Sequence, residues 1–282
     1  MNQFLTLCVN YKKDAETVEF VRTVAALPGY RGHVLVVSNS EAQRNGPLLT
    51  LLDIESVTLA RAKENLGYFG GISWGLEQYL KHNPMPEWVI VSNTDILFPD
   101  REFFEKLDHL FKKNPPAVIA PDIVLTVRSG LPSTNEHQNP YFRVRPSRVR
   151  MRAMRAVARF YPIYLIYEFT SLLRHGIQNK IGNARKGTVA SRKPIPIYAP
   201  FGAFIIFHRS YFEAGGSLRY PSFLFGEEIY VAETARGLGL RVMYEPRLRV
   251  IHQEHGSTAG IASRKIAGYV RDSSEYLVRM YF

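Results

Sequence analysis

Asp95 is the first residue whose type and position could serve chemistry. It lies in a polar loop directly after the apolar run 88–91. Mg²⁺ often takes only one or two protein carboxylates and completes its shell with phosphate oxygens and water, so a single Asp can suffice. The alternative is that Asp95 caps a helix predicted to begin near Asp100.

Two adjacent acids, Glu227 and Glu228, follow the apolar run 223–225. One of them could act as a general base that takes a proton from an acceptor hydroxyl. Acids are also favoured at helix starts by the helix dipole, and a helix is predicted over 228–238. The local pattern leaves both interpretations open.

His252 follows a short predicted strand and begins the polar segment 252–257, which holds a second histidine. This is not the HExxH order of a zinc protease. A contact with a phosphate or a cation fits the segment better. An ordinary solvated loop fits it equally well.

Gly67, Gly70 and Gly71 permit tight turns or a close approach of the backbone to a ligand. They do not form GxGxxG, and no P-loop lysine follows them. The dinucleotide-binding and ATPase interpretations therefore both lack their motif.

These residues need a scaffold, and the apolar runs predict one. Strands are expected at 4–9, 33–37, 57–60, 88–91, 117–119, 201–207, 241–244 and 248–251, and helices at 14–27, 67–82 and 228–238. Continuous apolar strands separated by helices are typical of a mostly parallel α/β sheet that is covered on both faces. In such sheets ligands bind beyond the carboxyl ends of the strands, where several of the polar residues above would lie.

The net charge of +11 is concentrated in one segment. Between Arg143 and Lys193 there are thirteen basic residues and a single acid, Glu168, so this segment carries +12 and the rest of the chain −1. A helix over 148–161 would gather four arginines on one side and three apolar residues roughly opposite. The arginines are Arg148, Arg152, Arg155 and Arg159, and the apolar residues are Met154, Val157 and Tyr161.

A basic amphipathic helix next to an aromatic run suits an anionic membrane interface. The alternative is a basic flap that packs on the core or on a partner chain. Nucleic acid is not expected as a partner, because no recognition motif accompanies the charge. The oligomeric state stays open.

The compartment is indicated by three expected absences. Residues 1–10 have neither the cationic start of a signal peptide nor the length of an anchor. No apolar run reaches the length of about 18 residues that spanning needs. Cys8 is the only cysteine, so an internal disulfide is excluded. We expect a cytoplasmic protein associated peripherally with the inner face of the cell membrane.

The ordered set of segments resembles glycosyltransferase family 2, particularly its rhamnosyltransferase-like bacterial members. The segments that carry the resemblance are FLTLCVNYKKD, HVLVVSNS, NLGYFGG, VSNTDILF, FGAFIIFHRSYFEAGG and FLFGEEIYVAETARGLGLRVMYEPRLRVIHQEHGST. They cover the chain from about Phe4 to Thr258, apart from the basic segment.

The resemblance implies a GT-A fold with a Rossmann-like nucleotide-binding half, an acceptor half and a basic helical insert, in a single domain over 1–282. The halves would be 1–98 and 196–262, and the insert 143–195. It also implies a nucleoside-diphosphate sugar donor, UDP- or dTDP-linked, together with Mg²⁺ or Mn²⁺ and inversion at the anomeric carbon. The acceptor would be a glycan or a lipid-linked oligosaccharide in cell-surface polysaccharide synthesis.

Site residues follow from the resemblance by position. Asp95 would hold the metal, with His252 beside the diphosphate and the metal. Glu228 falls on the catalytic base, with Glu227 next to it. The donor would lie among Asn10, Asn39, Asn65, Gly67, Gly70, Gly71 and Asn93.

Three departures from the family pattern bear on this assignment. Ser38 stands where an Asp usually contacts the nucleotide, Glu228 is one methylene longer than the usual Asp, and Tyr230 replaces an acid. Two other functions stay open: a sugar nucleotidyltransferase, and a catalytically silent, membrane-associated interaction module. The first would usually show a Gly-rich loop after the first strand, and the second need not bind a nucleotide sugar.

Overall fold

The computed structural model describes residues 3–40, 46–126, 136–165, 191–253 and 264–282. These residues form one ten-stranded sheet with the order β3-β2-β1-β4-β9-β6-β10-β5, in which β7 pairs with β6 and β8 with β10. The strands are β1 (Phe4–Asn10), β2 (Gly32–Ser38), β3 (Val57–Arg61), β4 (Trp88–Ser92), β5 (Ile96–Leu97), β6 (Val118–Leu125), β7 (Glu136–His137), β8 (Ile195–Pro196), β9 (Phe204–His208) and β10 (Val242–His252).

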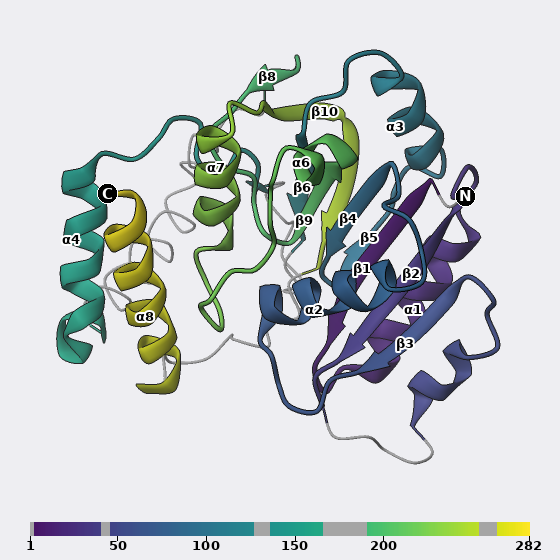
Figure 1. Cartoon of the computed structure of the whole chain (residues 1–282), viewed down its shortest axis with the longest axis horizontal. Helices are drawn as coiled ribbons and strands as arrows, with labels where there is room; N and C mark the ends of the chain where they lie inside the picture. Colours follow the sequence, from purple (N-terminus) through teal and green to yellow (C-terminus); the bar gives the residue numbers. More distant parts are fainter. Residues whose placement is uncertain (1–2, 41–45, 127–135, 166–190, 254–263) are drawn as a thin grey trace.

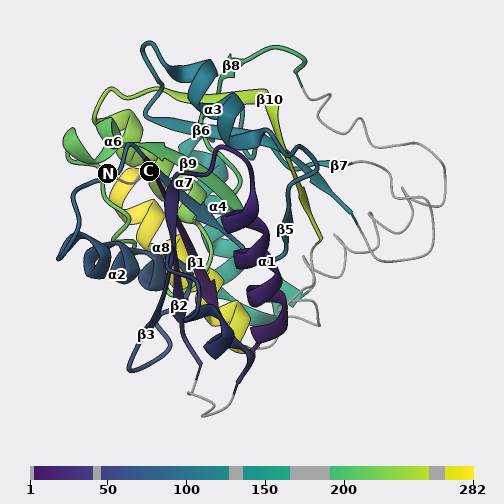
Figure 2. The ribbon, with the colours of Figure 1, turned by 90° about the vertical axis from the view of Figure 1, so that its right-hand side faces the viewer.

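The long strands are mostly parallel, as the sequence predicts. Strands β1 to β4 are mutually parallel, β9 is antiparallel to β4 and β6, and β6 is parallel to β10. Helices cover both faces, and Figure 2 shows the sheet between α1 and α2. The helices are α1 (Asp14–Ala26), η1 (Pro47–Leu51), α2 (Tyr68–Leu80), α3 (Phe103–Phe111), α4 (Arg148–Arg159), α6 (Arg209–Glu213), α7 (Glu227–Gly237) and α8 (Arg264–Tyr281).

The covered sheet explains why its strands are apolar throughout. In β1, Leu5 and Leu7 pack in a cluster with α2 and α7, while Phe4 and Cys8 pack in a second cluster with α1 and α3. All four side chains are fully buried. Both side-chain directions of the strand therefore face a core, which removes the alternation that a one-sided sheet would show.

Strands β6 and β10 are longer than the sequence predicts. The two runs expected at 241–244 and 248–251 are one strand, with a register shift between Glu245 and Arg249. Arg247 donates twice to the buried Glu245 carboxylate, at 2.7 and 2.6 Å. The bulge thus accommodates the charged residues that interrupt the apolar pattern.

Strand β6 runs on past its apolar start because its buried acid has partners from elsewhere in the chain. Asp122 accepts hydrogen bonds from Arg249 at 2.9 Å and from the Tyr244 hydroxyl at 3.2 Å. His137 Nδ1 contacts the same carboxylate at 2.5 Å. The charge is thus satisfied inside the sheet.

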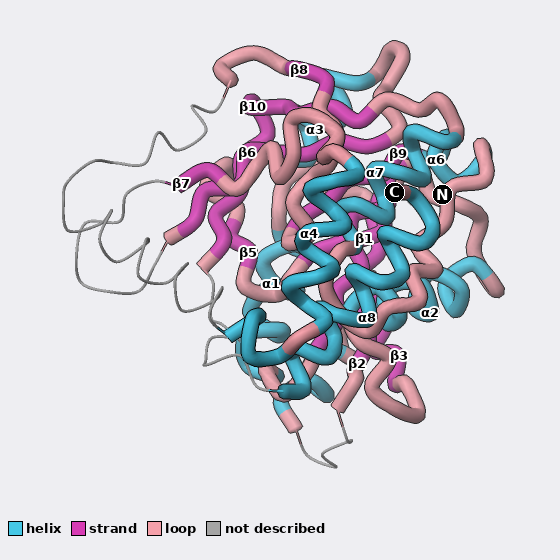
Figure 3. The backbone as a smooth tube through the Cα atoms, turned by 90° about the vertical axis from the view of Figure 1, so that its left-hand side faces the viewer, coloured by secondary structure: helices cyan, strands magenta, loops and turns pink. Residues whose placement is uncertain are grey.

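The described part of the basic segment begins with helix α4, which packs against α8 along one side of the molecule (Figures 1 and 3). The face of α4 turned inward carries Met151 and Ala158, both buried, whereas Met154 is 42% exposed. Arg155 forms an ion pair with Glu275 of α8 at 3.6 Å. The inward face is therefore rotated away from the predicted apolar side, because α8 supplies the packing surface.

Arg145, at the start of the basic segment, binds a buried acid. Arg145 donates to Glu233 at 2.6 Å and to the Tyr281 carbonyl at 2.6 Å. Glu233 also accepts from the Tyr198 hydroxyl and from Arg236. Burial alone would raise the pKa of Glu233, but these hydrogen bonds outweigh it and the pKa is lowered. Residues 166–190 of the segment lie outside the described part.

No helix in the described ranges combines the length and the apolar character needed to cross a membrane.

Candidate active site

The candidate residues converge on one edge of the sheet. The parallel strands β1, β2, β4, β6 and β10 all end at this edge, and the antiparallel β9 begins there. Asp95 follows β4, His252 ends β10, and Gly202 lies just before β9. The peptide N–H of Asn93 donates to the Ala203 carbonyl at 2.8 Å, which joins the loop after β4 to the loop before β9.

Asp95 and His252 form a close pair. His252 Nε2 lies 3.2 Å from Asp95 Oδ1, and both side chains are buried. The other ring nitrogen, Nδ1, lies 2.9 Å from Gln138 Oε1. Because that oxygen can only accept, Nδ1 carries the proton toward it, and Nε2 then requires a proton or a cation between itself and the carboxylate.

The spacing of this pair fits a divalent cation. Two ligands bonded to Mg²⁺ at about 2.1 Å and adjacent to each other lie about 3 Å apart. Within the described ranges no group of three or more His, Cys, Asp or Glu side chains gathers around one point. A cation at Asp95 and His252 would therefore take its remaining ligands from phosphate and water, as Mg²⁺ commonly does.

Glu227 and Glu228 begin α7 after a backbone turn of unusual geometry. Phe225 and Gly226 both have positive φ, 69° and 85°. A non-glycine residue at positive φ costs energy and is concentrated at functional sites. The turn aims Glu228 at the loop before β9: a Cβ on Gly202 would lie 2.9 Å from Glu228 Oε1, and the backbone N–H groups of Glu228 itself, Gly202 and Gly226 lower the pKa of this carboxyl.

The two acids have unusual electrostatics. Burial raises the pKa of Glu227, and the neighbouring Glu228 charge raises it further. Burial also raises the pKa of Glu228, although the backbone hydrogen bonds that it accepts lower it in part. A buried carboxyl with a raised pKa is suited to proton transfer near neutral pH.

Tyr68, at the start of α2, ties the acid pair to Asp95. Its hydroxyl donates to the Gly202 carbonyl at 3.1 Å, next to Glu228. Burial raises the pKa of Tyr68 well above its usual range, and the charges of Glu227 and Asp95 add to the effect. Gly202 lies beside both Glu227 and Glu228, and the ring of the preceding Phe201 lies 6.1 Å from the His252 ring, so the acid pair and the Asp95–His252 pair border one loop.

Two of the predicted donor-binding asparagines hold loops. Asn10 is fully buried; its amide donates to Asp14, and its carbonyl accepts from the Thr17 hydroxyl at 2.8 Å. Asn39 donates to the Gly67 carbonyl at 2.7 Å and accepts from the Leu66 N–H. They shape the edge at which a nucleotide would lie.

Of the remaining predicted donor residues, Asn65 and Gly67 lie in the segment that leads into α2, and Gly70 and Gly71 lie in the first turn of α2. Asn65 accepts from the Gly67 N–H at 3.0 Å. Gly67 has φ +74°, and a Cβ there would lie 2.1 Å from the Phe223 carbonyl oxygen. Gly71 packs against Val9 with little room, whereas a Cβ on Gly70 would have no neighbour closer than 3.6 Å.

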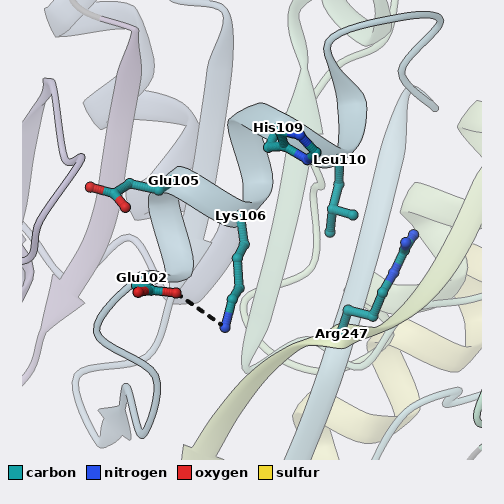
Figure 4. A pocket seen from close by; sticks show the side chains of 6 residues that line it. All are labelled: Glu102, Glu105, Lys106, His109, Leu110 and Arg247. Atoms are coloured by element: carbon teal, nitrogen blue, oxygen red, sulfur yellow. Dashed lines mark ion pairs between the residues drawn. The ribbon is translucent and has the colours of Figure 1, made fainter.

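A separate hollow lies between α3 and β10, away from these residues. Its lining is Glu102, Glu105, Lys106, His109, Leu110 and Arg247 (Figure 4). Arg247 precedes His252 by five residues along β10, which is about 15 Å of extended chain. This hollow contributes nothing to the acid cluster.

Sequence reasoning left three residues of the site without a role. Tyr68 lies inside the NLGYFGG segment, so its place in that motif was a usable signal. Gly202 and Gln138 gave no local signal, since their roles arise from a strand pairing and a contact across the sheet. Residues 254–257 of the predicted polar segment lie outside the described residues.

In sequence, the chain matches no known family model and no curated protein. In structure, it is similar to GalNAc-T7, solved with UDP, GalNAc and Mn²⁺, with a TM-score of 0.58 and 12% identity over 90% of this chain and 44% of that one. It is also similar to S. aureus TarS 1–349 in complex with UDP-GlcNAc, with a TM-score of 0.54 and 10% identity over 98% of this chain and 70% of that one.

A third similar structure is the mannosyltransferase PcManGT from Pyrobaculum calidifontis, in complex with GDP-Man and Mn²⁺. Its TM-score is 0.50, with 12% identity over 98% of this chain and 73% of that one. The chain spans less than half the length of the GalNAc-T7 structure that it matches. At these identities the likeness concerns the fold, and the fold of this chain is that of the GT-A glycosyltransferases.

Proposed function

We propose that the chain is an inverting, metal-dependent glycosyltransferase related to family 2. It would move a hexosyl or deoxyhexosyl group from a UDP- or dTDP-sugar to a hydroxyl of a glycan acceptor. The observation that carries the proposal is the meeting of the Asp95–His252 pair with Glu227 and Glu228 around Gly202, at the carboxyl edge of the sheet. The neighbouring structures that contain nucleotides or nucleotide sugars support it.

In this proposal the residues divide between donor and acceptor. Asp95 and His252 would hold Mg²⁺ or Mn²⁺, which when bound offsets the charge on a departing diphosphate. Gln138 keeps the His252 ring turned so that Nε2 faces Asp95. The half 1–98 would bind the nucleotide, and the half 196–262 would present the acceptor.

Glu228 would be the base of a single displacement. Its carboxylate takes the proton of the acceptor hydroxyl while that oxygen bonds to the anomeric carbon and the bond from this carbon to the diphosphate oxygen breaks. Attack from the face opposite the leaving group inverts the configuration. Glu227, whose pKa is also raised, is a second carboxyl beside the base.

The test is a transfer assay with UDP-, dTDP- and GDP-sugars and glycan acceptors, with and without Mn²⁺ or Mg²⁺. We expect transfer from at least one donor with inversion, seen by NMR of the product, and its loss on chelation. Asp95→Asn should weaken cation-dependent donor binding, measured by calorimetry. The exposed Asp53→Asn is the control. Full activity of Asp95→Asn, or donor binding indifferent to cations, would contradict the proposal.

The acceptor is proposed to be lipid-linked and to be met at the inner face of the cell membrane. On α4 the side chains of Arg148, Arg152 and Arg159 are exposed, and Val149 and Phe160 are 79% and 57% exposed. Each arginine near an anionic surface contributes on the order of 1 kcal/mol, and the exposed apolar side chains can enter the interface. Charge complementarity therefore favours anionic lipid as the occupant of this face.

Vesicle flotation tests this surface. The chain should float with vesicles that contain 30% phosphatidylglycerol, a choice of roughly physiological charge, and stay behind with pure phosphatidylcholine. Reversal of Arg148, Arg152 and Arg159 to Glu should abolish flotation. The control reverses three exposed cations elsewhere: Arg22, Lys112 and Lys113. Equal losses in both variants would show that net charge alone acts and would contradict a role for α4.

A further inference from the structure

The turn that leads into Glu227 and Glu228 is held by the C-terminal helix α8, which lies outside both proposed halves of the enzyme. The Phe223 ring stacks on Tyr269 of α8, with ring centres 4.6 Å apart. Gly226 is enclosed by the same helix: a Cβ there would lie 2.5 Å from Ser273 Oγ and 2.7 Å from Leu277 Cδ1. The strained turn therefore depends on α8 for its shape.

Ser273 makes the polar contact between α8 and the turn. Its hydroxyl is buried and donates to the Phe225 carbonyl at 2.7 Å. The Tyr220 hydroxyl lies 2.8 Å from the same Ser273 oxygen. A carbonyl can only accept, so the single Ser273 proton points at Phe225, and Tyr220 must donate to Ser273. The direction of the relay is thereby fixed from Tyr220 to Ser273 to Phe225.

The Phe225 carbonyl belongs to the same peptide group as the Gly226 nitrogen, and Gly226 is the residue directly before helix α7, which begins with Glu227 and Glu228. A peptide group cannot rotate one end without the other. Ser273 thus fixes, through one rigid peptide, the backbone from which Glu228 projects.

We propose that Ser273 is a positioning residue for Glu228, acting through the Phe225–Gly226 peptide and held in turn by Tyr220. The inference rests on the proposed function only in treating Glu228 as the catalytic base. The contacts of Ser273 do not depend on that role. Among the residues that the structure describes, the ionisable groups that face this carboxyl are Glu227 on the same helix, Tyr68 on α2 and Tyr220 in the segment before the turn.

Three variants separate positioning from ordinary packing. Ser273→Ala removes the donor to Phe225. Tyr220→Phe removes one buried hydrogen bond as well, but leaves the Ser273 proton on Phe225. Ser274→Ala is the matched control, because Ser274 is the next residue on α8 and bonds only to its own helix at Arg271.

We expect Ser273→Ala to lower kcat about tenfold or more, with the KM for the donor within about twofold, and to move the acidic limb of the pH–rate profile upward. Tyr220→Phe should lose a similar amount of stability but keep kcat within about threefold. Ser274→Ala should match the native chain. Native kcat in Ser273→Ala, or equal losses in Ser273→Ala and Tyr220→Phe, would overturn the proposal.

A second measurement needs no turnover. The ¹³Cδ resonance of Glu228, assigned with Glu228→Gln, can be titrated in the native chain and in Ser273→Ala. We expect a higher carboxyl pKa in the variant, because the turn that brings the Gly226 backbone N–H near Glu228, where it lowers the pKa of this carboxyl, loses its tie to α8. Identical titrations would overturn the positioning role, whereas a native chain without transfer activity would overturn only the proposed function.

Discussion

Replacement of Glu228 by Gln is the sharpest test of the proposed chemistry. Gln has nearly the shape of Glu but cannot accept a proton at neutral pH. Glu228 is buried, and the backbone N–H groups of Glu228 itself, Gly202 and Gly226 lower the pKa of its carboxyl. A Gln side chain keeps one acceptor oxygen for these donors and places an NH₂ group where the second oxygen was.

The magnitude follows from two losses. A positioned general base contributes about 10²- to 10⁴-fold to the rate, or about 3–5 kcal/mol of barrier. The NH₂ group near backbone donors adds about 1–3 kcal/mol to the free energy of the folded variant. This cost lowers the stability of the variant more than its rate. We therefore expect kcat to fall at least about 100-fold, with the KM for the donor within about threefold.

The matched comparison is Glu227→Gln. It removes the neighbouring carboxyl and leaves Glu228 with the backbone N–H groups that lower its pKa. We expect its kcat to fall less than about tenfold and its acidic limb to stay in place, because Glu228 ionises first and its charge raises the pKa of Glu227, not the reverse. The assay is steady-state release of nucleoside diphosphate from pH 5 to 9 at saturating donor. A larger loss in Glu227→Gln than in Glu228→Gln would refute the assignment of the base.

Three further predictions concern stability and are measured by thermal or urea unfolding. The pKa of Glu227 is raised in the folded state, so its contribution to stability is complete below the unfolded-state pKa of about 4.3. This contribution is lost as the pH rises through the folded-state pKa. Glu227→Gln should therefore raise Tm at pH 8 by about 2–4 °C and leave Tm unchanged at pH 4. Gly67→Ala should cost about 2 kcal/mol or more, while Gly70→Ala in the first turn of α2 should be neutral or stabilise by about 0.5 kcal/mol. Arg145→Ala should cost about 2–4 kcal/mol with an unchanged urea m-value, because Glu233 stays buried with one donor fewer.

The parts of the fold that were predicted correctly are those that local pattern determines. The runs 4–9, 33–37 and 88–91 are apolar because both of their faces are buried, and these three runs and the edge run 57–60 are all strands. The helix ending near Leu27 is confirmed, with Leu27 as its C-cap. In each case burial and the flanking turn residues point to the same structure.

The wrong boundaries share a physical cause. Strand β6 was expected to end at 119, before Pro121 and Asp122, and β10 was expected to break at Glu245. Both strands continue because charges from distant parts of the chain meet: Arg249 pairs with Asp122, and Arg247 with Glu245. The helix expected near Asp100 begins at Phe103, after Asp100 caps the Glu102 N–H and pairs with Lys106.

Helix α8 was not predicted, although it packs against the two elements that matter most to the proposed function. It bears Ser273 against the turn before the acids and Glu275 against Arg155 of α4. Of the four arginines predicted to face the membrane, Arg155 is the one that pairs with α8. The other three stay exposed on the same side of α4.

The candidate site shows how far residue type can lead before geometry is needed. Asp95, His252 and the acid pair can be proposed from motifs because each is chemically conspicuous, and the structure brings them to one edge. What determines their behaviour is less conspicuous: a Gln amide that sets the His252 proton, a Tyr hydroxyl on a glycine carbonyl, and a serine on the last helix. Such groups gain their roles from strand pairing and helix docking, which no local spacing encodes. Conservative changes at Ser273 are therefore expected to alter proton transfer at Glu228 more than their separation of 45 residues would indicate.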